Sequence, residues 1–135
     1  MSGLQDPRLL VRRWRLQRVV EDHRTGERHA IDGTLEISEQ GERLRWEESL
    51  VWRRPDGDVD VRRGLWLVQV DDAWWVRFED GRDFHPWAPG EAVEHPCAPD
   101  TYRGLVEGTP RRWTVRWSAR GPAKDYDMTS VLTPG

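Results

Sequence analysis

The side chains with the greatest capacity for chemistry gather in one short stretch, residues 85–102. The stretch contains His85, His95, Cys97, Asp100 and Tyr102. If it is extended, His95 and Cys97 point to the same side, because side chains two positions apart share a face. Imidazole, thiolate and carboxylate groups all bind zinc. His85, His95 and Cys97, with Asp100 as a fourth ligand, would therefore suit that metal. Their spacing matches no zinc pattern, and the sequence therefore predicts no metal and no other cofactor.

Other roles for these residues stay open. Cys97 beside a histidine could act as a nucleophile, whereas a lone buried cysteine is more often inert packing. His85 and His95 could transfer protons, or they could bond to the backbone at turns. We expect His85, His95, Cys97 and Tyr102 to face a ligand, and the sequence assigns a catalytic role to none of them.

Lys124 is a second candidate, because every other cationic residue among the 21 Lys and Arg of the chain is Arg. It lies between a Gly-Pro turn and Tyr126, in the sequence RGPAKDYD. Arg carries a rigid, permanently charged fork, whereas Lys carries a compact ammonium group whose pKa responds to burial. We therefore expect Lys124, held near Tyr126, to contact a carboxylate, enolate or carbonyl oxygen of a ligand.

Alternation of apolar and charged residues predicts the elements that position these side chains. Period two is typical of half-buried antiparallel strands. The pattern predicts strands at residues 12–20, 31–38, 43–52, 60–70, 74–80, 101–107, 112–120 and 126–132. Short turn signals rich in Gly, Asp and Pro separate them. No helix of ten or more residues and no internal repeat is predicted.

These strands favour an all-β chain, a single domain over residues 1–135. Strands joined by tight hairpins suggest an up-and-down antiparallel β-barrel of about eight or nine strands, because closure removes exposed edges. Residues 85–100 contain four Pro, and Pro is excluded from central strands. We expect this segment to form a long connection over an open end of the barrel.

Three charged residues break the alternation on faces expected to point inward. Arg18 shares a face with Leu16, Glu48 with Leu50, and Arg62 with Trp66. A buried charge must be paired or must meet a ligand. An internal Arg–Glu pair and a ligand-facing role are both open for these residues.

Composition excludes several classes of protein. The net charge is −3 and the Arg residues are interleaved with Asp and Glu, so no basic stripe for nucleic acid is present. No apolar run long enough to cross a membrane occurs, and the start lacks the features of a signal peptide. The single Cys fits a reducing compartment, so we expect a cytoplasmic protein. Nine Trp residues offer large rings for a core or a pocket.

Three motifs resemble those of an uncharacterised bacterial family of unknown function. They are F-x-D-G-R-x-F-H at 78–85, H-x-C-x-x-D-x-Y at 95–102 and W-x-x-x-W-x-x-x-G-P-x-K-D-Y at 113–126. The chain departs from the family at Arg12, where a Gly is usual, and at Gly64, where an aromatic residue is usual. The resemblance implies a lipocalin-like (calycin) barrel and no established activity. By analogy with such barrels, Lys124 could instead lie over Trp14 and plug the closed end through a cation–π contact.

We expect a small-molecule-binding barrel with a Trp-lined pocket for an aromatic or anionic ligand. The expected ligand-binding residues are Arg18, Glu48, Arg62, Trp66, His85, His95, Cys97, Tyr102, Trp117, Lys124 and Tyr126. The alternative is a cofactor-independent isomerase, cyclase or lyase in which Lys124 and Tyr126 stabilise an oxyanion and a His moves a proton. A structural or interaction module with a fully packed interior is a third possibility. A homodimer also stays open.

Overall fold

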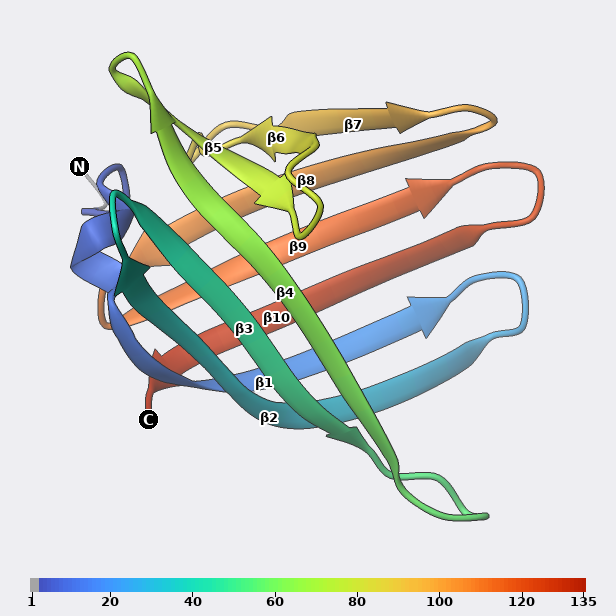
Figure 1. Ribbon diagram of the computed structural model, residues 1–135. Helices are drawn as coiled ribbons and strands as arrows, with labels where there is room; N and C mark the ends of the chain where they lie inside the picture. Colours follow the sequence, from blue (N-terminus) through green and yellow to red (C-terminus); the bar gives the residue numbers. More distant parts are fainter. Residues whose placement is uncertain (1–2) are drawn as a thin grey trace.

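The computed structural model describes residues 3–135, which form ten antiparallel strands in one sheet that curls into a nearly closed barrel (Figure 1). Their bounds are Arg12–Asp22 (β1), Glu27–Gln40 (β2), Arg43–Trp52 (β3), Val59–Val70 (β4), Ala73–Phe78 (β5), Asp83–Pro86 (β6), Val93–Cys97 (β7), Asp100–Thr109 (β8), Arg112–Arg120 (β9) and Asp125–Pro134 (β10). The order in the sheet is β6-β5-β4-β3-β2-β1-β10-β9-β8-β7, so β1 pairs with β10 and the two ends of the sheet are β6 and β7.

The predicted up-and-down antiparallel barrel is confirmed, and the eight predicted segments correspond to β1–β5 and β8–β10. The expectation that residues 85–100 form one long connection was wrong, because β6 ends and β7 lies within them. Both are short end strands of the sheet, where a Pro such as Pro86 or Pro96 removes no hydrogen bond that a second neighbour would need. No helix among residues 3–135 is long and apolar enough to cross a membrane.

One end of the barrel is closed by the segment that precedes β1. A short 3₁₀ helix, Pro7–Leu10, is capped by Asp6, and Leu4 and Leu10 are fully buried. The indole Nε1 of Trp14 donates to the Leu10 carbonyl at 2.9 Å, and that of Trp87 donates to the Leu4 carbonyl at 2.8 Å. These two bonds tie the N-terminal segment to the inner face of the barrel.

Four buried indoles fill this closed end. Trp113 lies at their centre, with its ring 5.6 Å from that of Trp14, 5.7 Å from that of Trp46 and 6.3 Å from that of Trp87. All three contacts are edge-to-face, the arrangement that aromatic quadrupoles favour. These Trp side chains therefore pack against one another as core and do not line an empty pocket.

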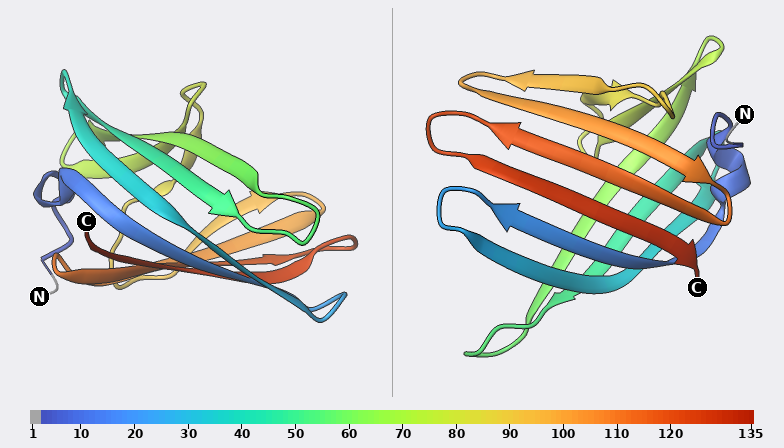
Figure 2. Two further views of the ribbon diagram at one scale, coloured as in Figure 1. Left: turned by 90° about the horizontal axis from the view of Figure 1, so that it is seen from below. Right: turned by 180° about the vertical axis from the view of Figure 1, so that it is seen from behind.

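The opposite end is less densely covered. The β1–β2, β7–β8 and β9–β10 hairpins lie side by side there, while β3 and β4 cross the β8–β10 layer steeply and end apart from them (Figures 1 and 2). Inner-face residues near this end are only half-buried: Val20, Ile31, Val61, Tyr102, Tyr126 and Met128. We call these six residues the open half of the barrel.

Aromatic side chains close the seam between β6 and β7, which are not paired with each other. The Phe84 ring stacks on Phe78 at 4.5 Å and on Trp117 at 5.0 Å, and His95 Nδ1 donates to the Phe84 carbonyl at 2.9 Å. The Trp117 indole lies across Gly104, where a Cβ atom would come within 2.7 Å of the ring. The absence of a side chain at Gly104 therefore allows Trp117 to reach the seam.

We predict that Gly104→Ala destabilises the barrel by about 1–3 kcal/mol, because the added methyl group displaces Trp117 from the stack on Phe84. Urea unfolding followed by circular dichroism measures the effect. In a Trp117→Leu background the same substitution should cost much less, since the ring that it meets is gone. An equal cost in both backgrounds would contradict this explanation.

Candidate functional site

A buried polar layer crosses the middle of the barrel. Alternation along β1, β3 and β10 points Arg18, Glu48 and Ser130 inward, and Arg18 lies opposite Ser130 in the β1–β10 pairing. The Arg18 guanidinium donates to Ser130 Oγ at 2.8 Å and to Glu48 Oε1 at 3.0 Å. Trp46 Nε1 donates to the other Glu48 oxygen at 2.9 Å. The internal Arg–Glu pair that the sequence left open is thus present, with Glu48 only 2% exposed.

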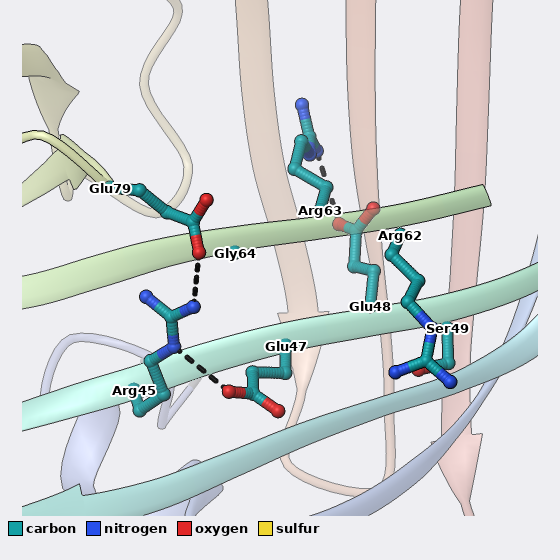
Figure 3. A pocket seen from close by; sticks show the side chains of 8 residues that line it. All are labelled: Arg45, Glu47, Glu48, Ser49, Arg62, Arg63, Gly64 and Glu79. Atoms are coloured by element: carbon teal, nitrogen blue, oxygen red, sulfur yellow. Dashed lines mark hydrogen bonds and ion pairs between the residues drawn. The ribbon is translucent and has the colours of Figure 1, made fainter.

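A second arginine shares the Glu48 carboxylate. Arg63, the cross-strand partner of Glu48 on β4, places its NH2 group 3.1 Å from Glu48 Oε2. Figure 3 shows both side chains on one side of the strands, whereas Arg62 and Ser49 point to the other side. Burial raises the pKa of Glu48, but the opposing charges of Arg63 and Arg18 and the bonds from its partners lower it to about 2. Glu48 is therefore ionised at neutral pH, and this layer holds two cations for one anion.

The Arg63 guanidinium lies where the buried layer meets the open half. Its side chain is 34% exposed, so part of the group is accessible. Its Nε atom, in contrast, is buried and has no hydrogen-bond partner among residues 3–135. Arg63 reaches Glu48 through NH2 and not through Nε, which leaves this donor unused.

His85 lies on the other wall, opposite Val76 in the β5–β6 pairing. Its Nδ1 atom is 2.7 Å from the Pro86 carbonyl oxygen, which can only accept, so Nδ1 carries the proton. Burial, with a smaller contribution from the charge of Arg63, lowers the pKa of His85 to about 4. The ring is therefore neutral at pH 7. His85 and Arg63 both line an internal void of about 20 Å³.

The predicted residues at the hairpin end form a second group. Lys124 Nζ donates to the Tyr102 hydroxyl at 2.6 Å and lies 3.6 Å from Asp100 Oδ2. The bond to Tyr102, with the charge of that group and of Asp100, raises the pKa of Lys124. Burial raises the pKa of Tyr126, while the charges of Lys124 and Arg63 act in the opposite direction. Tyr126 thus lies within the field of both cations.

The alternative in which Lys124 plugs the closed end over Trp14 was wrong. Trp14 pairs with Pro134 at one end of β10, whereas Lys124 lies in the turn that precedes the other end. The cation over the Trp14 ring is Arg12, at 5.1 Å. Lys124 instead lies 5.4 Å from the ring centre of Tyr102.

The expectation that Arg62 and Trp66 point inward was also wrong. Arg62 is exposed, and the Trp66 ring lies on the outer face of the barrel beneath two guanidiniums, Arg43 at 3.6 Å and Arg45 at 4.7 Å. Both faces of this strand carry bulky apolar residues, so alternation alone did not fix which one is internal. Cation–π contacts explain how an indole remains stable outside.

Arg63 is the residue of the site that the sequence analysis missed. It shares its face with Leu65 and Leu67, which are 4% and 0% exposed. That alternation was visible in the sequence, but the competing face with Trp66 indicated the opposite side as the inner one. Ser130, the hydrogen-bond partner of Arg18, carried no signal, because a single hydroxyl on a strand has many uses.

The outer face of β3 and β4 carries a groove of about 210 Å³ around Gly64 (Figure 3). Arg45 crosses this position to pair with Glu79, and it also bonds Glu47 at 3.0 Å. A Cβ atom at Gly64 would collide with both partners of the Arg45–Glu79 pair. The charges that line this groove largely pair with each other.

The remaining predicted residues are distributed between the seam and the surface. Trp117 is buried and lines the void beside His85, and His95 is half-buried at the seam. Cys97 is exposed at the end of β7 and is not brought together with Arg63 or His85. Over residues 3–135, no group of three or more His, Cys, Asp or Glu side chains is placed to hold a metal ion.

Comparison with known proteins identifies a family and a fold. Residues 10–134 match DUF6314, a family of unknown function. No curated protein matches the chain. Among solved structures, the S-type phycobiliprotein lyase CPES from Guillardia theta is similar with a TM-score of 0.65 and 10% identity, over 95% of this chain and 89% of that one. The likeness confirms the lipocalin-like barrel fold.

We predict that Glu48→Gln lowers the free energy of unfolding by about 3 kcal/mol at pH 7, because it leaves Arg18 and Arg63 without their anion. Since the pKa of Glu48 falls from 4.5 to about 2 on folding, its contribution is complete above pH 4.5 and disappears as the pH falls through 2. The difference between wild type and variant should therefore shrink over that range, in urea unfolding at a series of pH values.

Asp127 provides the matched control, because its pKa is also lowered to about 2, by Ser118, His23 and Arg120 at the surface. Asp127→Asn should cost far less at pH 7, since its side chain is 40% exposed. Equal costs for the two variants would show that burial of the Glu48 pair contributes nothing special.

Proposed function

The chain belongs to the DUF6314 family of unknown function, and we propose that the open half of its barrel binds a small anionic molecule with an aromatic or apolar body. The finding that carries this proposal is the two-to-one ratio of guanidinium to carboxylate in the buried layer. The surplus positive charge resides on Arg63, which is the partly exposed member of the pair. A ligand carboxylate that enters from the open half would neutralise it.

The arginine geometry favours a planar oxyanion. A guanidinium offers its donors in a fixed fork that matches a carboxylate, and hydrogen bonds between charged groups are about twice as strong as neutral ones. Arg63 uses NH2 for Glu48, while its NH1 group makes no hydrogen bond to a residue in the described part of the chain. The attraction between such a donor and an anion is stronger in a partly buried site than in water, because the effective dielectric constant is lower.

The inner wall of the open half suits the body of such a ligand. Tyr102, Met128, Ile31 and Val61 pack against the core while remaining half-buried, and Tyr126 lies beside them with its ring in reach of the Arg63 charge. Apolar and aromatic walls with a few convergent polar groups are typical of small-molecule sites. The Lys124–Tyr102 pair at the rim adds hydrogen-bond donors where a polar end of the ligand would emerge.

The closed end of the barrel has the packed interior that was the third possibility from the sequence. The internal voids found there measure about 20 Å³ and 10 Å³, which is room for a water-sized group and not for a ligand. The Trp-lined pocket expected from the sequence is therefore replaced, in this proposal, by a site that begins at the polar layer and opens toward the hairpins.

Binding is supported better than the alternative of cofactor-independent catalysis. A proton-transfer residue works best with a pKa near the operating pH. The pKa of His85 is lowered to about 4 and that of Lys124 is raised, so neither group exchanges a proton readily at neutral pH. The similar structure is named a phycobiliprotein lyase, which supports the use of this fold for handling small molecules and does not identify a reaction for this chain.

We predict that the protein binds 2-naphthoate at least about tenfold more tightly than the neutral 2-naphthamide, because a hydrogen bond to a charged group contributes about 1.5–3 kcal/mol. Arg63→Met should remove this preference. Isothermal titration calorimetry measures both dissociation constants, and circular dichroism verifies that the variant is folded, since Glu48 keeps Arg18 and Trp46 as partners.

Arg62→Met is the matched control, because it removes the same charge one position away on the outer face. It should leave the preference for 2-naphthoate intact. If 2-naphthoate fails to bind, or if Arg62→Met weakens it as much as Arg63→Met does, the proposal is wrong.

A further inference from the structure

We propose that the ligand of the open half carries a hydroxyl group as well as its acidic group, and that this hydroxyl is received by the void between Arg63 and His85. The inference rests on the proposed function and specifies the class of ligand as a hydroxylated aromatic acid. It is carried by an unused donor on Arg63 and an unused acceptor on His85, two residues that line the same internal void.

The donor is Arg63 Nε–H. The atom is buried and has no hydrogen-bond partner among residues 3–135, because Arg63 bonds Glu48 through NH2 and not through Nε. A buried donor without a partner costs about 1–3 kcal/mol, so a folded protein gains by giving it an acceptor.

The acceptor is His85 Nε2. Because Nδ1–H donates to the Pro86 carbonyl at 2.7 Å, the neutral ring must present a lone pair at Nε2. Nε2 makes no hydrogen bond to any residue from 3 to 135. Burial keeps the ring neutral, since it lowers the pKa of His85 to about 4.

Most of the remaining lining is apolar. It consists of aliphatic side chains, among them Leu65, Val76 and Val106, and of aromatic rings. The indole N–H groups of Trp46 and Trp87 already donate to Glu48 and to the Leu4 carbonyl. The Trp117 indole makes no hydrogen bond to residues 3–135, so it could also donate to a group in the void, beside the Arg63 donor and the His85 acceptor.

Only a group that both accepts and donates satisfies these two atoms. A hydroxyl accepts from Arg63 Nε–H and donates to His85 Nε2, and a void of about 20 Å³ has room for a group of that size. A carboxylate would place its lone pairs against that of His85, an ammonium group would face the Arg63 cation, and an ether could not donate to His85. A primary amide also donates and accepts, but it needs room for both an oxygen and a nitrogen atom. The size and the chemistry of the void together therefore favour a hydroxyl.

The same void suits a water molecule when no ligand is bound, for the same reason. A ligand hydroxyl that reproduces the bonds of an ordered water releases that water, and the gain in affinity is up to roughly tenfold to thirtyfold. A ligand without the hydroxyl leaves the water in place and lacks the gain. Arg63 would then bind the acid and, through Nε, also recognise the hydroxyl.

The test compares benzoate with 2-, 3- and 4-hydroxybenzoate on the full chain, with dissociation constants from NMR titration. We expect at least one hydroxybenzoate to bind about tenfold more tightly than benzoate. In His85→Phe the ratio of the two constants should fall to about one. His95→Phe, which changes the same residue type at the seam, should preserve the ratio.

The ¹⁵N signals of His85 in the unmodified protein give a second measurement that needs no variant. The Nε2 signal should shift on binding of the preferred hydroxybenzoate and not on binding of benzoate. A preference that is absent, or that persists in His85→Phe, or a His85 signal that stays fixed, would overturn this inference while leaving the proposed function standing. Failure of benzoate and of 2-naphthoate to bind would overturn the proposed function and this inference together.

Discussion

A single buried carboxylate, that of Glu48, organises the interior of this barrel. Three side chains from three strands donate to it: Arg18 from β1, Trp46 from β3 and Arg63 from β4. Taking an ion out of water costs several kcal/mol, so the carboxylate is tolerated only with these partners in place. It lies between the end of the barrel that is packed with indoles and the half-buried inner residues of the open half. The register of β1, β3 and β4 must be correct for this contact to form, because a shift by one residue would turn each charged group outward.

The ratio of two guanidinium groups to one carboxylate connects the fold to the proposed function. One anion between two guanidiniums leaves a surplus positive charge, and Arg63 is the partly exposed cation of the two. His85, whose tautomer leaves Nε2 as an acceptor, lines the same void as Arg63. In our proposal, the charge of Arg63 selects an anion and the void selects a hydroxyl.

Sequence patterns predicted much of this arrangement and failed where two patterns competed. Alternation predicted the barrel, and the isolated charges Arg18 and Glu48 on apolar faces left open an internal ion pair, which is present. On β4, however, Trp66 suggested one inner face and Leu65 with Leu67 another, and the choice of Trp66 hid the role of Arg63. The end strands β6 and β7 were missed because Pro argues against central strands and says little about the ends of a sheet. Pairing distant residues, such as Lys124 with Tyr102, depends on tertiary packing that no local pattern encodes.

A crystal structure of the protein with 6-bromo-2-naphthoate tests the proposed site most directly, because anomalous scattering from bromine locates the ring without bias. We expect the carboxylate to lie on the Arg63 guanidinium, Glu48 to keep both arginines, and the bromine to lie in the open half near Tyr126. A naphthoate bound only at the outer face beside Arg62, or an Arg63 turned away from Glu48 to a different partner, would contradict the proposal.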